Sequence, residues 1–205
     1  MIGLAVLAGI AIYVGVWWFL VRTLSQGWAK ALAILIALAI PFWDLPVGYL
    51  RYQNYCVSEG GLRISSRIAP QESVYFDSVP SYPANELIAE GIRVVEIARP
   101  DGRGIARHER QGAGSITTLI ITRPQSSLRV TYVRNQRLDW NIIREDRYVR
   151  NQADARLLAQ YSEFSWQGGW LQHSFAPILG TGLRCTAGSR DPIITLLVHG
   201  GAPSS

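Results

Sequence analysis

The sequence predicts a membrane-anchored α+β protein, with an N-terminal two-helix transmembrane hairpin followed by a mainly antiparallel β domain that carries one or two short helices. Two observations lead to this prediction. The chain opens with two apolar segments, residues 2–21 and 31–50. Each is about twenty residues, or roughly 30 Å of helix, which is enough to cross the hydrocarbon core of a bilayer. Beyond them, short β-branched runs alternate with turn residues, as in antiparallel sheets.

The domain organisation follows from these segments. Residues 1–50 form the predicted hairpin, and residues 51–198 are enough for one globular domain of ordinary size. Residues 199–205 are expected to be a flexible tail, because chain ends without apolar anchors fray.

Charges around the apolar segments predict the topology of the hairpin. Arg22 and Lys30 lie in the short connection between the segments, and no basic side chain precedes the first segment. Positively charged loops stay on the cytoplasmic side, so both termini and the β domain are expected outside the cytoplasm. The residues expected at the membrane interfaces are Trp17, Trp18, Trp28, Trp43 and Asp44.

The outer half of the second apolar segment contains Pro41, Asp44 and Pro46. Proline frees a backbone carbonyl in a helix, and a carboxylate at membrane depth needs water or a partner. We therefore expect the helix to end or kink near Phe42. Asp44 is expected to be an interfacial residue, because a proton relay would require a second ionisable group inside the membrane.

Cys56 and Cys185, the two cysteines, stand near opposite ends of the predicted domain. Outside the cytoplasm such a pair predicts a disulfide, whereas in the cytosol it would be two unrelated thiols. The predicted topology favours the disulfide. Closing so long a loop would contribute about 5 kcal/mol to the free energy of unfolding in the chain-entropy model.

The elements of the domain are placed by turn residues and by the period of the apolar residues. A short helix is expected over residues 85–90, between a capping Asn85 and Gly91. Residues 154–160 fit either a helix or a strand. The expected strands are residues 62–68, 74–79, 93–98, 115–122, 128–133, 141–149 and 193–198.

Two hairpins and one long loop are also predicted. The β-branched runs 115–122 and 128–133 are expected to pair with each other. The aromatic runs 161–166 and 170–175 flank a glycine turn and are expected to form a second hairpin. Residues 101–114, rich in glycine and arginine, are expected to be a mobile loop.

The net positive charge does not indicate nucleic-acid binding. The chain has 20 basic and 15 acidic residues, and without those of the first fifty residues 18 and 14 remain, spread over the whole domain. The richest basic stretch holds Arg144, Arg147 and Arg150, but acids interleave with them. This pattern is typical of a solvated mixed-charge face, with an anion- or lipid-binding patch as the alternative.

Motifs for catalysis or cofactor binding are missing from the sequence, so we expect no enzyme, no metal and no cofactor. The glycine pairs match neither the dinucleotide-binding nor the P-loop spacing, and a nucleophile elbow is absent. His108, His173 and His199 lie too far apart to form a recognisable ligand set. Glu59 and Glu163 lie near aromatic residues, where salt bridges with arginine are the commoner outcome.

Aromatic residues near the C-terminal end give a candidate partner or ligand surface. Exposed indole rings stack on sugars, but core packing in a sheet explains the same residues, so both interpretations stay open for Trp166 and Trp170. The residues assigned to this candidate surface are Trp166, Trp170, Arg144, Arg147 and Arg150.

One pattern resembles a known group of proteins. Trp43-Asp44, Gly48, Cys56 and Glu59-Gly-Gly61, with Gly168-Gly-Trp170 downstream, are similar to a group of small uncharacterised bacterial inner-membrane proteins. Those proteins have an apolar N-terminus and the same Trp-Asp to Cys-x-x-Glu-Gly spacing. The resemblance implies a bacterial origin and a location in the cell envelope, and it assigns no catalytic residue.

These observations give one hypothesis and two alternatives. We expect a non-enzymatic, membrane-anchored periplasmic binding or structural protein of the bacterial envelope. Its expected partners are the lipid bilayer and another envelope protein or a second copy of the chain, without nucleic acid or nucleotide. The first alternative is a membrane-tethered enzyme acting on envelope glycan, peptidoglycan or lipid. The second is a pore or lysis component built from the hairpin.

Overall fold

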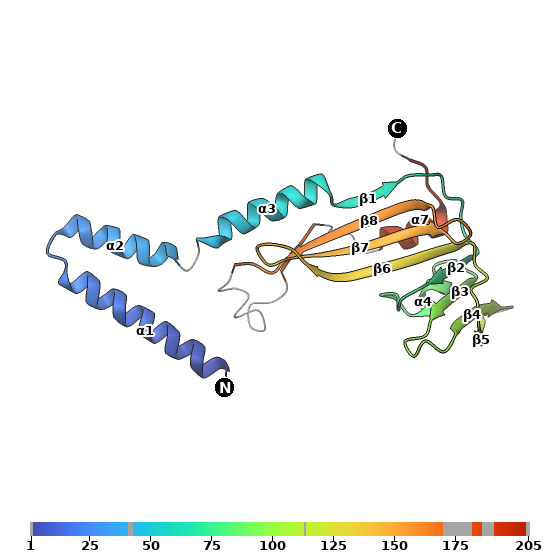
Figure 1. Ribbon diagram of the computed structural model, residues 1–205, viewed down its shortest axis with the longest axis horizontal. Helices are drawn as coiled ribbons and strands as arrows, with labels where there is room; N and C mark the ends of the chain where they lie inside the picture. Colours follow the sequence, from blue (N-terminus) through green and yellow to red (C-terminus); the bar gives the residue numbers. More distant parts are fainter. Residues whose placement is uncertain (1, 41–42, 113, 170–181, 186–190, 204–205) are drawn as a thin grey trace.

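A computed structural model describes residues 2–40, 43–112, 114–169, 182–185 and 191–203 (Figure 1). The molecule is elongated, with a pair of helices at one end and a large sheet at the other. Helices α1 (Ile2–Thr23) and α2 (Gly27–Ala39) form the pair, which we call the arm. Helix α3 (Asp44–Ser58) leads from the arm to the sheet, and we call everything from α3 onward the body.

Composition explains the helices of the arm. Helix α2 is rich in alanine and leucine, which lose little conformational entropy in a helix, and α1 is apolar over residues 2–21. The Tyr13 hydroxyl donates a hydrogen bond to the Ala37 carbonyl and so ties α1 to α2. Between them the chain turns at residues 24–26.

The predicted transmembrane hairpin is wrong. Residues 31–50 are divided between two helices, because α2 ends at Ala39 and α3 begins at Asp44. Among the helices of the described residues, none is both long enough and apolar enough to cross a membrane. The membrane-anchored fold class, the transmembrane helices and the two-pass inner-membrane location with outward termini are corrected accordingly.

A local signal explains the division of the second segment. Asp44 and Pro46 both lie in the first turn of α3. A carboxylate is favourable there because it faces free N–H groups, and a proline is tolerated because no hydrogen bond is lost. Averaged hydropathy does not contain these helix-start signals, so it merged two helices into one span.

The body is built on one mostly antiparallel sheet, the part of the predicted fold that the structure retains. Its order is β1-β8-β7-β6-β2-β3-β4-β5, with β9 paired to β8, and β2 is parallel to both β3 and β6. The strands are β1 (Gly61–Ile64), β2 (Ser73–Phe76), β3 (Val94–Ala98), β4 (Ile105–Gln111), β5 (Ser115–Ile121), β6 (Leu128–Arg137), β7 (Ile142–Asn151), β8 (Leu157–Trp166) and β9 (Leu183–Arg184).

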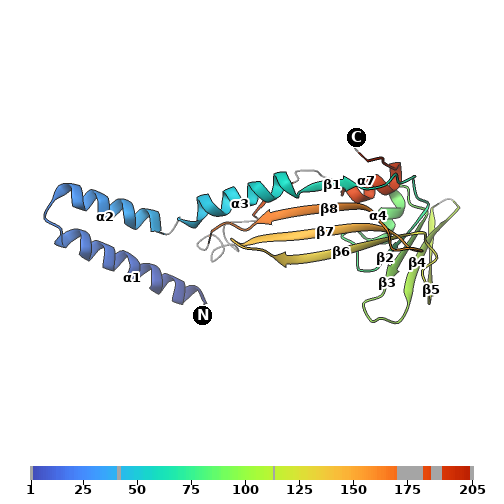
Figure 2. The ribbon, with the colours of Figure 1, turned by 45° about the horizontal axis from the view of Figure 1, so that its top comes forward.

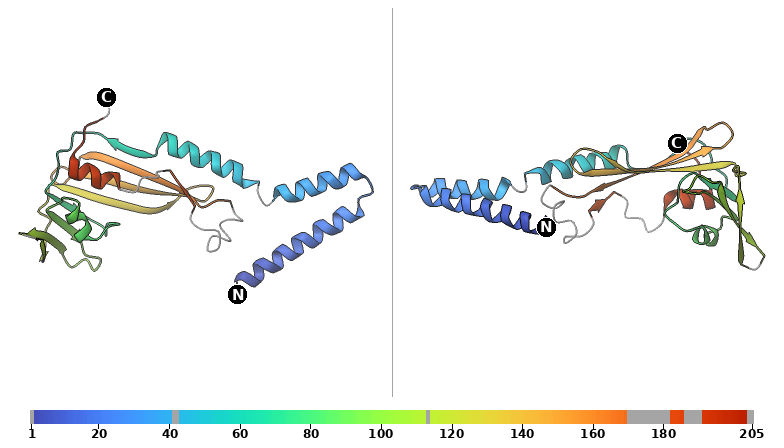
Figure 3. Two further views of the ribbon diagram at one scale, coloured as in Figure 1. Left: turned by 180° about the vertical axis from the view of Figure 1, so that it is seen from behind. Right: turned by 60° about the horizontal axis from the view of Figure 1, so that its bottom comes forward.

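Helices cover both faces of the sheet. Helices α4 (Ala84–Ala89) and α7 (Pro192–His199) lie on one face, and α3 lies on the other (Figure 3). The larger core is on the α4 and α7 side, around the fully buried Phe76 and Val130. A second cluster under α3 includes Phe164 and Trp166. Each fully buried side chain of this kind contributes about 1.5–3 kcal/mol.

Three predicted elements of the body are wrong. Residues 101–114 are not one long loop, because β4 occupies seven of these fourteen residues. The strands over 115–122 and 128–133 exist as β5 and β6 but do not pair with each other: β5 pairs with β4, and β6 pairs with β7 and β2. Residues 193–198 form helix α7 rather than a strand. The run 170–175 lies outside the described residues.

Helix α7 had a start signal that the strand prediction overlooked. The Asp191 carboxylate accepts a hydrogen bond from the Ile193 N–H at 2.9 Å, and Pro192 occupies the first helical position. Both are typical of a helix N-terminus. The ambiguous residues 154–160 continue into β8, and Gly201 pairs with Ile68, so part of the predicted tail is fixed to the body.

Candidate functional site

Apolar side chains are exposed along the arm from Ile12 to Ile36 and at Ile40. Helix pairs of soluble proteins usually bury one apolar stripe, and a helix that is apolar all round is normally covered. The exposed large apolar residues of the arm and its end are Ile12, Val14, Val16, Trp18, Phe19, Leu20, Trp28, Leu32, Ile34, Leu35, Ile36 and Ile40. A contiguous apolar surface of this kind marks an interaction site.

Charge is confined to one end of the arm. Arg22 and Lys30 are its charged residues, and both flank the turn between α1 and α2. The Arg22 guanidinium lies 5.1 Å from the centre of the Trp18 ring. The length of the arm is therefore uncharged, so a partner needs no complementary charge there.

Aromatic contacts fix α3 to the sheet and so set where the arm leaves the body. The Tyr55 ring stacks on Phe164 at 5.4 Å, and Tyr52 stacks on Trp166 at 6.3 Å between ring centres. A Cβ at Gly48 would lie 3.0 Å from Nε1 of Trp166. This close approach leaves little room for a side chain at Gly48.

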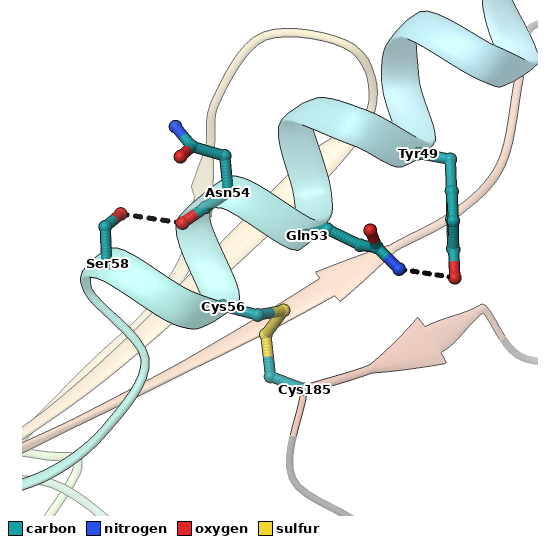
Figure 4. Close-up of a disulfide and its surroundings, with 6 residues drawn as sticks. All are labelled: Tyr49, Gln53, Asn54, Cys56, Ser58 and Cys185. Atoms are coloured by element: carbon teal, nitrogen blue, oxygen red, sulfur yellow. Dashed lines mark hydrogen bonds between the residues drawn. A yellow bond between two sulfur atoms is a disulfide. The ribbon is translucent and has the colours of Figure 1, made fainter.

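A disulfide between Cys56 and Cys185 closes the same junction (Figure 4). The two Cα atoms are 5.4 Å apart, although 129 residues separate them in the chain. Cys56 is in the last turns of α3, and Cys185 directly follows β9. The structure thus contains the disulfide that the cysteine count predicted, and it joins α3 to the C-terminal part of the sheet.

The described residues of the predicted partner surface do not come together as one patch. Trp166 is only 7% exposed, and its Nε1–H donates a hydrogen bond to the Trp140 carbonyl at 3.1 Å. Trp166 is therefore a core residue and not an exposed ring for a ligand. Trp170 lies outside the described residues. Arg144 and Arg147 are three residues apart on β7 and therefore point to opposite faces.

Each of the three arginines has its own surroundings. Arg144 donates to Asp146 at 2.8 Å and to Glu59 at 2.9 Å. Arg147 is buried beneath α7, while the exposed Arg150 lies over the Tyr148 ring at 5.6 Å. They act as separate contacts rather than as a basic patch.

Arg147 is the centre of a buried ion network. Its guanidinium is 3.1 Å from the Asp191 carboxylate and 3.3 Å from Glu163, and it lies against the rings of Tyr132 and Tyr161. Burial alone would lower the pKa of Arg147, but Asp191, Tyr132 and Glu163 together raise it above its ordinary value. The network links α7 to the sheet through ion pairs.

Tyr132 belongs to the same network. Burial raises the pKa of its phenol far above the ordinary value, and the nearby Asp191 carboxylate raises it further. The Tyr132 hydroxyl lies 3.4 Å from Asp191. A phenol that holds its proton so firmly is suited to a structural hydrogen bond and poorly suited to proton transfer.

The glutamates Glu59 and Glu163 form salt bridges with arginines. Glu59 pairs with Arg144, and Glu163 with Arg147 and, at 3.9 Å, with Arg184. Within the described residues, His, Cys, Asp and Glu form no group able to hold a metal ion. The Nδ1 atom of His108 lies 3.0 Å from the Thr118 hydroxyl, and burial lowers the pKa of this imidazole.

A cavity of about 300 Å³ lies between α4 and α7. Its lining includes Glu86, Glu90 and Asp191 together with Tyr82 and Thr195. Asp191 is already bonded to Arg147 and to the N-terminus of α7. We therefore assign this cavity no ligand.

The residues predicted at membrane interfaces have different environments. Trp18 and Trp28 are exposed on the arm, and Trp17 is half-buried beside Tyr13. The exposed Trp43 meets Trp140 edge-on at 5.7 Å, and Asp44 is buried at the start of α3. Their predicted interface role depended on the hairpin that the structure corrects.

Sequence reasoning missed two features of the body. Glu96 is fully buried and accepts hydrogen bonds from the N–H groups of Gln125 and Ser126 and from Arg107. A single glutamate in an apolar strand gives no signal of these distant partners. The other feature is that β5 is an exposed edge strand, with Ile116 and Ile120 38% and 57% exposed.

Known proteins add no identification. No family model, curated protein or solved structure matches the chain. The resemblance based on Trp43-Asp44 and Cys56 therefore stays a prediction, and the proposals for function rest on the surfaces described above.

Proposed function

We propose that this protein is a non-catalytic structural protein that assembles with copies of itself through the arm. The observation that carries the proposal is the apolar surface of α1 and α2, where side chains such as Phe19 and Leu35 are 64% and 65% exposed. Exposed apolar area of this extent is unfavourable in water, and association removes it.

The chemistry of the arm selects the partner. A matching surface must be long, apolar and free of charge, and the arm of a second copy has these properties. Two helical hairpins packed together would form a four-helix bundle with apolar residues inside. Two-fold dimers are the commonest oligomers, because one self-complementary patch is sufficient.

The positions of Arg22 and Lys30 are compatible with such a bundle. Both flank the turn at the free end of the arm, so they can stay in water while the apolar lengths of the helices pack. Since α3 and the disulfide hold the other end, the arm projects away from the sheet (Figure 1). Packing of two arms would leave both sheets free.

Sedimentation equilibrium of the full-length chain tests the proposal. We expect the wild-type chain to be a dimer or a higher oligomer, and the double variant Phe19→Glu/Leu35→Glu to be at least tenfold weaker in association. Each lost apolar contact is worth about 1.5–3 kcal/mol, and 1.4 kcal/mol corresponds to a factor of ten.

Val57→Glu is the matched control, because Val57 is 88% exposed but lies on α3 outside the arm. It should leave association unchanged. A wild-type chain that stays monomeric would overturn the proposal, as would equal weakening by both variants. So would a wild-type chain that binds neutral lipid vesicles or another protein through the arm without self-association.

A further inference from the structure

We propose a second contact between copies: strand β5 pairs with β5 of another copy, antiparallel, around a two-fold axis at Thr118. This inference is independent of the arm contact and goes beyond it. Strand β5 ends the sheet and pairs only with β4 among the described strands. It lies at the end of the molecule opposite the arm (Figure 2).

The edge at β5 has none of the usual protection against pairing. Natural edge strands are short, charged, bulged or interrupted by proline. Strand β5 has seven residues, Ser-Ile-Thr-Thr-Leu-Ile-Ile, without charge or proline, and its register with β4 is continuous. The opposite edge, β1, is shorter and carries Arg63.

The hydrogen bonds of the β3–β4 pair show which backbone groups of β4 point inward. Arg99 N–H donates to the Gly104 carbonyl at 3.2 Å, and Arg110 N–H donates to the Arg93 carbonyl at 3.1 Å. In an antiparallel ladder, bonded and non-bonded pairs alternate. The even-numbered residues of β4 therefore bond to β3, and the odd-numbered residues bond to β5.

The same alternation determines the free edge. Arg107 of β4 is opposite Leu119, so the odd-numbered residues of β5 are those bonded to β4. The residues of β5 whose N–H and C=O groups face outward are Ile116, Thr118 and Ile120. These backbone groups have no strand beside them among the described residues.

The positions of these three residues make β5 self-complementary. When two antiparallel copies are centred on Thr118, each Ile116 is opposite Ile120 of the other copy, and Thr118 is opposite itself. All the outward N–H and C=O groups of the three residues then find partners. On the other face, Thr117 lies opposite Leu119, so no like charges are opposed anywhere along the strand.

Side chains favour the same pairing. Ile116, Leu119 and Ile120 are 38%, 52% and 57% exposed, and the two-fold pairing brings each beside an apolar or threonine side chain. Ile116 also borders a groove of about 390 Å³ between α4 and the β4–β5 hairpin, with Ile88 and Arg110 in its wall. Strand β5 of a second copy of this protein thus fits the free edge of β5 in both its backbone groups and its side chains.

Charge substitution at the axis tests the inference. The experiment uses the full-length chain with Phe19→Glu/Leu35→Glu, so that association through the arm does not contribute. Thr118→Lys or Thr118→Glu alone places like charges opposite each other, and we expect at least tenfold weaker dimerisation for each. An equimolar mixture of the two should recover the dimer, because unlike charges then meet.

Thermal melting of each Thr118 variant provides the folding control. Both substitutions remove the Thr118 hydroxyl from Nδ1 of His108, at 3.0 Å, while the outward backbone groups of this exposed residue are not part of the β4–β5 ladder. A parent chain that stays monomeric at every accessible concentration would overturn the inference. A mixture that dimerises no better than its components would also overturn it. Both results differ from a failure of the arm contact. The arm contact is tested with the wild-type arm, whereas the β5 contact is tested in the chain that carries Phe19→Glu/Leu35→Glu.

Discussion

Apolar side chains form buried clusters in the body but are exposed in the arm. In the body, Phe76, Phe164 and Ile142 are fully buried between helices and the sheet. In the arm, Phe19, Trp18 and many aliphatic residues face outward. The two regions also differ in charge: the body contains ion pairs such as Arg147–Asp191, whereas the arm has charged residues only beside its turn.

This difference separates stability from interaction. Burial in the body contributes to the folding of a single chain, because these side chains leave water without any partner molecule. The exposed apolar side chains of the arm stay in water when a single chain folds. They leave water only when the arm associates with a partner. The comparison predicts that equivalent substitutions have unequal effects in the two regions.

A matched pair of phenylalanines gives the largest expected difference. Phe76→Ala should lower the free energy of unfolding by about 3–5 kcal/mol, because it leaves a cavity in the larger core. Phe19→Ala should change it by less than about 0.5 kcal/mol in a dilute, monomeric sample, as is usual for exposed positions. Urea denaturation followed by circular dichroism measures both.

Phe19→Ala has a second expected effect, on association. It should weaken self-association under conditions where Phe76→Ala, if still folded, leaves association intact. Equal losses of unfolding free energy in the two variants would mean that the arm is packed within its own chain, and the comparison between arm and body would fail.

The disulfide gives the second prediction, because it fixes α3, the helix that leads from the arm, to the rest of the body. Replacing both Cys56 and Cys185 by alanine should lower the free energy of unfolding by about 2–5 kcal/mol, the usual range for such a bond. Reduction of the wild-type chain should reproduce this loss, and reductant should have no effect on the double variant. An unchanged melting temperature after reduction would show that the disulfide does not stabilise the fold.

The sequence predicted the strands of the body better than their pairing. Short apolar runs bounded by turn residues located β2, β3 and β7, because these signals depend on local sequence alone. Pairing depends on distant segments: β5 and β6 are neighbours in the chain but belong to different parts of the sheet. The glycines on either side of β4 led to the prediction of a loop. Pairing with β3 and β5 stabilises this strand although its own sequence has only a weak preference for β structure.

Helix ends were the other source of error. Asp44 with Pro46, and Asp191 with Pro192, mark the starts of α3 and α7, yet the apolar residues around them dominated the prediction. For the candidate site, cysteine count led to the disulfide, since only one pairing exists for two cysteines. The free edge at β5 had no equivalent signal, because strand order is a property of the whole sheet.

His108 gives the smallest expected effect and tests whether the pH dependence of stability belongs to the body. The described part of the arm contains no histidine. Burial beneath neighbouring side chains lowers the pKa of His108 below its usual 6.5. The unfolded chain therefore takes up this proton at a higher pH than the folded chain does.

The sign of the effect follows from this difference in proton uptake. Well above pH 6.5 His108 is neutral in both states and contributes no slope. As the pH falls through 6.5, the unfolded state binds more protons than the folded state, so the free energy of unfolding decreases until the folded imidazole is also protonated. Chemical denaturation at several pH values should show a shallower decrease for His108→Gln than for the wild-type chain. Parallel curves for the two chains would contradict this origin. A slope that disappeared only in the arm variant Phe19→Glu/Leu35→Glu would move the pH dependence to association and away from the fold of the body.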